Sequence, residues 1–160
     1  MKSIGSIPVT ASRAEKYRLL LSAAEALMDP EAGPVANMSN LVAIIREAFG
    51  FHWVGFYLVN GNELTLGPFQ GPPACTRIAL GKGVCGTAWK RNEAVVVPDV
   101  NLFPGHIACS ALSKSEVVVP FTKDAQVIGV LDIDSDCEND FSEIDIHGLT
   151  ALLKVLDSTL

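Results

Sequence analysis

The sequence predicts an α+β fold in which a mostly antiparallel central sheet is flanked by helices. Apolar residues recur at helical spacing near both ends of the chain, and β-branched and aromatic runs joined by short turns occupy its middle. With 160 residues and 49% hydrophobic content, the chain can bury one substantial core but is too short for two comfortable ones. These observations predict one domain over residues 1–160.

Two helices are predicted in the first 50 residues. The first covers about residues 12–28, where apolar side chains recur every three to four positions before Asp29 and Pro30 end the helix. The second covers residues 36–49 and carries one apolar stripe formed by Leu41, Ile44, Ile45 and Ala48. Both helices therefore have a face that needs a sheet or another helix to cover it.

The middle of the chain predicts strands over residues 51–59, 63–69, 75–80, 94–97, 117–121 and 126–134. Asn60, Gly61 and Asn62 are typical of a hairpin turn between the first two strands. A short helix is expected over residues 83–91. Residues 101–114 form a long loop rich in Gly, Pro and Ser, which is typical of segments that carry binding sites.

The start of the last helix is well marked. Ser142 is expected as the N-cap, Asp145 follows three residues later, and Phe141 is positioned to pack on Ile146. The predicted helix runs over residues 142–158.

Charge and hydropathy exclude several functions. The net charge is −6, and the longest basic cluster is Lys90-Arg91, so a surface that follows nucleic-acid phosphates is not expected. The N-terminus lacks the continuous apolar region of a signal peptide, and no window reaches the roughly 18 apolar residues of a membrane span. We expect a cytoplasmic protein without a nucleic-acid or membrane partner, in which the four cysteines are not a static disulfide framework.

Three acidic residues are expected to meet in the sheet. Asp132 and Asp134 are two residues apart on a predicted strand, so both point to one face while Leu131 and Ile133 point to the other. Glu116 lies at the mouth of the preceding strand. Crowding of three carboxylates would raise the pKa of at least one, which would then keep a proton near neutral pH. Solvated side chains at a strand end are the alternative.

Three of the four cysteines suggest redox chemistry. Cys75, Cys85 and Cys109 are separated by nine and 23 residues, which is unlike any short metal knuckle. A zinc site that adds His106 remains conceivable, and a buried core thiol is the usual role of a lone cysteine. Cys85 lies near the start of the short helix, where the helix dipole can lower the pKa of a thiol. Cys137 lies among acidic residues and is expected to be a bystander.

Five segments follow one another along the chain: GVCGTAWK (83–90), VVVPDV (95–100), SEVVVPF (115–121), IGVLDIDS (128–135) and FSEID (141–145). This order resembles a GAF domain over nearly the whole chain. Three further segments resemble the small stand-alone GAF proteins that act as free methionine-(R)-sulfoxide reductases: FHWVGFYLV (51–59), GPFQGPPACTRIALGKGVCG (67–86) and HIACSALSKSE (106–116). The resemblance implies N-terminal helices over about 12–49, the sheet and active-site loop over about 51–134 and a C-terminal helix over about 142–158.

The resemblance also implies roles for individual residues. Cys109 would be the nucleophile and Cys75 the preferred resolving partner, with Cys85 as a second candidate. The substrate-binding set would comprise the acids Glu116, Asp132 and Asp134, the aromatic residues Trp53 and Tyr57, and backbone groups around Ile107 and Ala108. A thioredoxin-like protein would supply electrons, a homodimer would form through the terminal helices, and no cofactor or metal is expected.

Two other functions are weighed against this one. A GAF sensor would bind a cyclic nucleotide or another small ligand, or respond to oxidation without turnover; sensors normally pass their signal to a fused output domain, and none is predicted within these residues. Residues 81–86 fit the pattern G-x-G-x-x-G, but the surrounding strands are joined by hairpins and no acidic residue follows about 20 positions later at a strand end. The reductase is therefore the favoured prediction.

Overall fold

The computed structural model describes residues 7, 8, 10–107 and 110–160. Its helices and strands are, in chain order, α1 (Arg13–Leu27), α2 (Pro34–Phe49), β1 (Trp53–Asn60), β2 (Glu63–Gln70), β3 (Arg77–Ala79), α3 (Gly83–Arg91), β4 (Val95–Val97), the 3-10 turn η1 (Val100–Leu102), β5 (Ser115–Lys123), β6 (Gln126–Ser135) and α4 (Glu143–Asp157). The predicted α+β class and the order of its elements are confirmed.

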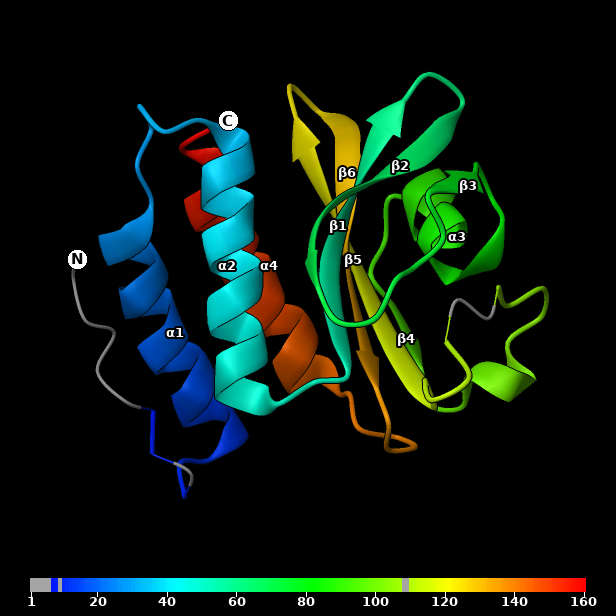
Figure 1. Cartoon of the computed structure of the whole chain (residues 1–160), viewed down its shortest axis with the longest axis horizontal. Helices are drawn as coiled ribbons and strands as arrows, with labels where there is room; N and C mark the ends of the chain where they lie inside the picture. The colour runs from blue at the N-terminus through cyan, green and yellow to red at the C-terminus, as the bar shows by residue number, and fades with distance from the viewer. Residues whose placement is uncertain (1–6, 9, 108–109) are drawn as a thin grey trace.

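The six strands form one antiparallel sheet in the order β3-β2-β1-β6-β5-β4. Helices α1, α2 and α4 lie together on one side of this sheet, and α3 lies on the other side (Figure 1). β6 occupies the centre of the sheet between β1 and β5. A residue on β6 therefore has strand neighbours on both sides.

The main core lies between the sheet and the layer of α1, α2 and α4. Leu131 and Ile133 of β6 are completely buried in it, as the alternation of the strand predicts. They pack with the apolar stripes of the three helices, including Leu41, Ile45 and Leu152, each of which is completely buried. Burial of this kind stabilises a fold by about 25 cal/mol per Å² of apolar surface removed from water.

A buried carboxylate joins two of these helices. Asp145 near the start of α4 is completely buried and accepts hydrogen bonds from Arg13 Nε (2.6 Å), the Tyr17 hydroxyl (2.8 Å) and the backbone N–H of Ser142 (2.8 Å). The last bond completes the capping box predicted from the sequence. The same guanidinium donates to Asp140, which in turn accepts from the Ser135 hydroxyl at the end of β6. The helix layer is thus tied to the strand that carries the acidic pair.

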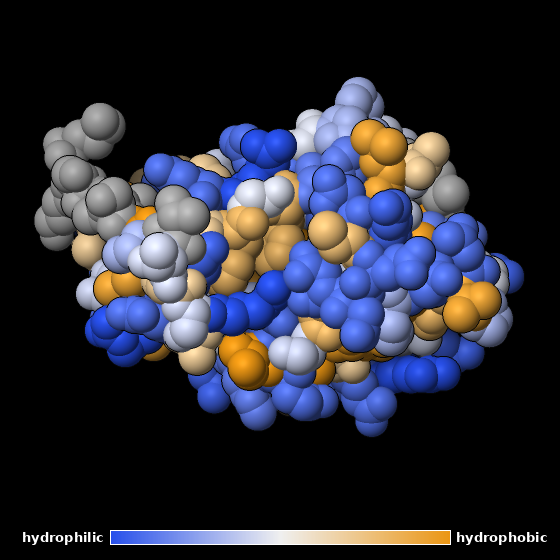
Figure 2. All heavy atoms as spheres, turned by 90° about the horizontal axis from the view of Figure 1, so that it is seen from below, coloured by the Kyte–Doolittle hydropathy of each residue, from blue (hydrophilic) through white to orange (hydrophobic). Residues whose placement is uncertain are grey.

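The opposite face of the sheet holds a smaller core beneath α3. It contains Trp53 and Tyr57 of β1, Val130 of β6 and Val84 and Cys85 of α3. None of the helices among the described residues is long and apolar enough to cross a membrane. Hydrophilic atoms cover most of the face shown in Figure 2, and its apolar atoms form small groups.

Several boundaries differ from the prediction, including the starts of α2 at Pro34 and of β1 at Trp53. The strand expected over 75–80 is reduced to β3, because only Arg77, Ile78 and Ala79 pair with β2. β5 is longer than expected at both ends, because its ladder with β6 runs from Ser115 to Lys123. The long loop, expected from residue 101, begins at Val100 with the 3-10 turn η1. The side chain of Asp99 caps this turn by accepting a hydrogen bond from the backbone N–H of Asn101.

Candidate active site

The predicted acidic residues meet on the face of the sheet that α3 covers. Glu116 of β5 lies directly opposite Asp134 of β6 in the antiparallel ladder, and Asp132 lies opposite Val118. Because side chains alternate along each strand, all three acids point to the same face. Glu116 is 6% exposed and Asp132 is 7% exposed, whereas Asp134 is only partly buried. The strands therefore bring three carboxyl groups to one place, and two of them are almost completely buried.

Burial and mutual repulsion keep protons on these groups. Burial raises the pKa of Asp132 well above its usual range, and the charges of Glu116 and Asp134 raise it further. Burial, and then the charge of Asp134, raise the pKa of Glu116 in the same way. The pKa of Asp134 is also raised by burial, although a hydrogen bond from Ser113 and the nearby rings of His52 and His106 oppose the rise. The cluster therefore holds exchangeable protons above the pH at which ordinary carboxyl groups lose them.

Two aromatic side chains form a wall beside the acids. Trp53 and Tyr57 of β1 are almost fully buried, and their rings stack with centroids 5.9 Å apart. Trp53 pairs with Asp134 in the β1–β6 ladder, and Gly55 pairs with Asp132. A Cβ atom on Gly55 would lie 2.3 Å from the Trp53 ring, so a larger residue there would displace the indole. The absence of a side chain at position 55 lets the indole ring lie beside the carboxyl groups.

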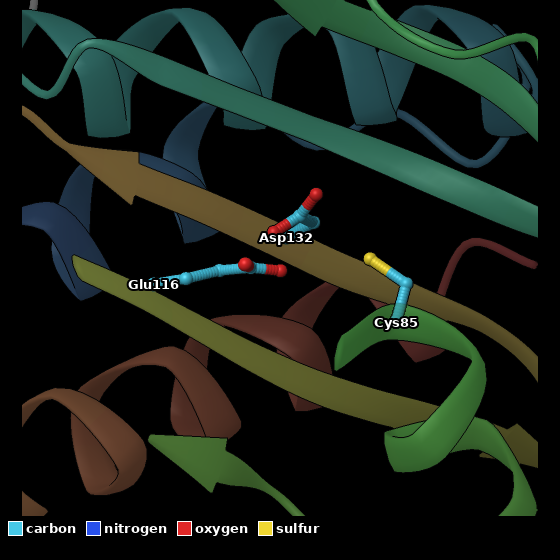
Figure 3. A group of neighbouring side chains, drawn as sticks. All are labelled: Cys85, Glu116 and Asp132. Atoms are coloured by element: carbon cyan, nitrogen blue, oxygen red, sulfur yellow. The ribbon is translucent and has the colours of Figure 1, made fainter. Parts of the chain in front are cut away.

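Helix α3 brings Cys85 to the same place. Figure 3 shows the side chains of Cys85 from α3, Glu116 from β5 and Asp132 from β6 pointing toward one another. One ligand-type atom of each residue lies within 4.8 Å of the other two. The helix begins at Gly83, whose φ of +59° favours glycine and whose missing side chain leaves room for Ile107. The start of the helix and the long loop are therefore in contact.

A cavity opens beside these groups. Its volume is about 520 Å³ when the open solvent at its mouth is included. Its lining includes Trp53, Tyr57, Cys85, Ile107, Glu116, Asp132 and Asp134. Seven of the ten residues predicted for the site thus line one cavity. Ala108 and Cys109 lie outside the described residues.

The cysteines have different environments. Cys75 is half-buried and disulfide-bonded, and its carbonyl oxygen accepts a hydrogen bond of 2.9 Å from the Tyr57 hydroxyl. Cys85 and Cys137 are free thiols, the first buried and the second exposed. The expectation that the α3 N-terminus lowers the pKa of Cys85 is wrong, because burial and the neighbouring Asp132 and Glu116 raise that pKa well above its usual range. Cys85 is therefore a protonated thiol at neutral pH.

Several polar residues of the cavity were not selected from the sequence. His106 places Nε2 3.5 Å from Glu116 Oε2, and its position in the loop near Cys109 was the one available signal. His52 Nε2 lies 3.0 Å from the Ser110 hydroxyl oxygen, which links the start of β1 to the loop. Ser110, Ser113 and Lys82 also line the cavity, and no sequence pattern pointed to them.

Residues 36–156 match the family described as GAF domain. The chain belongs to the GAF domain family. The fold of this GAF domain is similar to a crystal structure of free methionine-R-sulfoxide reductase from Neisseria meningitidis in complex with its substrate, with a TM-score of 0.91 and 49% identity over 96% of this chain and 94% of that one.

Two relatives match the GAF domain over nearly its whole length. Free methionine-R-sulfoxide reductase of Escherichia coli is 44% identical over 93% of this chain and 91% of its own. GAF domain-containing protein A of Dictyostelium discoideum is 56% identical over 92% and 94% of the two chains. One of these names states an activity and the other states only the domain.

The protonated carboxyl groups make the stability of this GAF domain depend on pH. A carboxyl group whose pKa is higher in the folded state than in the unfolded state contributes to the stability of the folded state. This contribution is complete below the unfolded pKa, 3.8 for an aspartate, and is lost as the pH rises through the folded pKa. Each pKa unit corresponds to about 1.4 kcal/mol. The melting temperature of the wild type should therefore fall between pH 5 and pH 8. Asp132→Asn should make this fall smaller and should raise the melting temperature at pH 8, by roughly 2–4 °C for each kcal/mol of stability gained.

Thermal unfolding followed by circular dichroism would measure both effects. Asp136→Asn, at an exposed position just after β6, is the matched control and should melt like the wild type. Parallel melting curves for wild type and Asp132→Asn across this pH range would show that Asp132 is an ordinary ionised carboxylate.

Proposed function

We propose that this GAF domain is a reductase that converts free L-methionine-(R)-sulfoxide to L-methionine. One observation carries the proposal: buried protonated carboxyl groups and an aromatic wall line one cavity, close to a cysteine that forms a disulfide. Reduction of a sulfoxide needs these components, because a thiolate must attack sulfur while an acid protonates the departing oxygen. The names of the Escherichia coli and Neisseria meningitidis proteins support this substrate.

Cys109 is the proposed nucleophile. Its thiolate attacks the sulfoxide sulfur, the oxygen passes to the enzyme as a sulfenic acid, and the thioether methionine is released. Cys75 then attacks the sulfenic sulfur, so that a disulfide forms and water leaves. The disulfide-bonded state of Cys75 supports this choice over Cys85, which is a buried free thiol with a raised pKa. An external dithiol, for which we propose a thioredoxin-like protein, returns the enzyme to its reduced form.

The acidic cluster supplies the proton that the sulfoxide oxygen needs. Glu116 and Asp132 retain protons because burial raises the pKa of both. Trp53 and Tyr57 form an apolar surface against which the S-methyl group can pack. The ammonium and carboxylate groups of the amino acid are assigned to backbone groups around Ile107 and Ala108, of which Ile107 lines the cavity.

The reaction is tested with racemic free methionine sulfoxide and a thioredoxin regenerating system, with chiral chromatography of both epimers. Wild type should consume only the R epimer, and Cys109→Ser should abolish turnover because it removes the nucleophile. Cys75→Ser should release about one methionine per enzyme and then stop, since its sulfenic acid lacks a resolving partner, and a monothiol should restart it. Cys137→Ser, at an exposed free thiol, is the matched control and should turn over normally. Failure of wild type to consume either epimer would instead favour a ligand-binding GAF module.

The same assay tests the acidic cluster. Asp132→Asn should lower kcat/KM by about 100-fold or more, the usual contribution of a general acid. Because this variant is expected to melt at a higher temperature than wild type, a loss of activity could not be attributed to unfolding. Unchanged kcat/KM in Asp132→Asn would remove Asp132 from the proton-donating group.

Association of two chains through the terminal helices also stays a proposal, as does a cytoplasmic location. α1 and α4 lie on the side of the sheet opposite α3 (Figure 1). Because the cavity is lined by residues of the α3 side, pairing through α1 and α4 would leave the site open. Analytical ultracentrifugation at micromolar concentration should give the mass of two chains. A single 17.0 kDa species at that concentration would exclude the homodimer.

A further inference from the structure

We propose that Cys85, Glu116 and Asp132 form a binding site for a divalent cation of the zinc class. The three residues come from α3, β5 and β6, and their side chains converge in Figure 3. One ligand atom of each lies within 4.8 Å of the others. Zinc binds oxygen at about 2.0–2.2 Å and sulfur at about 2.3 Å, so an approach of about 1 Å by these side chains would allow all three to coordinate one ion.

The donor set selects the class of metal. A thiolate favours borderline and soft cations, whereas Mg²⁺ and Ca²⁺ prefer sites built only from oxygen ligands. One sulfur and two carboxylate oxygens leave a fourth position of a tetrahedral zinc site open. His106 lines the same cavity, and its Nε2 lies 3.5 Å from Glu116 Oε2, so this ring can approach the fourth position. The cation enters as the thiol and carboxyl protons leave to solvent.

An unpartnered oxygen atom independently points to a ligand here. Asp132 Oδ1 is buried and has no hydrogen-bond partner among the residues that the structure describes, although the carboxyl group as a whole is hydrogen-bonded to Cys85 and Glu116. A buried acceptor without a partner usually costs about 1–3 kcal/mol, so groups of this kind are commonly satisfied by a water molecule or an ion. Asp132 also lines the cavity, which gives a cation a route from solvent.

The site does not need the redox cysteines. Cys85 is a free thiol in a structure in which Cys75 is disulfide-bonded, so the site is available in the oxidised protein. The bound cation would occupy the carboxyl groups that donate the proton to the sulfoxide. Inhibition of turnover is therefore a consequence that rests on the proposed function, whereas binding of the cation does not.

Cobalt(II) is the probe, because a cobalt–thiolate bond gives a charge-transfer absorption band in the near ultraviolet. The experiment uses the oxidised protein, since reduced Cys75 and Cys109 could themselves bind the metal. Co²⁺ should give a saturable band that Zn²⁺ abolishes by competition. Cys85→Ser should remove the band and weaken Co²⁺ binding by at least about 100-fold, and Cys137→Ser should leave both unchanged.

Glu116→Gln is a second variant that keeps the thiol, and it should retain a band of shifted wavelength with affinity lowered by about 10-fold or more. Circular dichroism establishes that each variant is folded. A band that survives Cys85→Ser, a band lost in Cys137→Ser, or no saturable Co²⁺ binding to the oxidised wild type would overturn the proposal. None of these measurements requires turnover, so a failed reductase assay and a failed cation site give different results.

Discussion

The burial of neighbouring carboxyl groups at the start of β5 and the end of β6 is the constraint on which the rest of this structure depends. Glu116 and Asp132 are almost completely buried, and they share one face of the sheet with Asp134. Each would be ionised in water at neutral pH, and each instead keeps a raised pKa. This arrangement costs folding free energy, and it persists because the opposite face of the same strands contributes an extensive apolar core.

The two faces of β6 therefore have opposite roles. Leu131 and Ile133 pack against the layer of α1, α2 and α4, while Asp132 and Asp134 point into the cavity. The ion pair of Arg13 with Asp145 and Asp140 joins the helix layer to the end of β6 through Ser135. Arg13 and Asp140 are only partly buried, so this connection contributes chiefly through its geometry: one guanidinium contacts both carboxylates. Contacts on the helix-covered face of the sheet therefore position the residues that line the cavity on the other face.

Cys85 illustrates how the environment of a residue overrides its place in the sequence. A thiol near a helix N-terminus suggests an activated nucleophile, but the side chain is turned toward two carboxyl groups and away from water. The same contacts that make it a poor nucleophile make it a suitable metal ligand, because a cation compensates the charges that disfavour the thiolate. Trp53 shows a related dependence, since its ring occupies space that Gly55 leaves open on its own strand.

Short-range periodicity and capping were enough to predict the order of the elements and the face on which the residues of β6 lie. The sequence predicted α3 to the residue, the capping box at Ser142 and Asp145, and the shared face of Asp132 and Asp134. Contacts between distant segments set the surroundings of that pair. They are the register that places Glu116 opposite Asp134, the packing of α3 that brings Cys85 to Asp132, and the approach of His106 to Glu116. Local patterns cannot specify such contacts, because desolvation and pKa depend on neighbours that are distant in the chain.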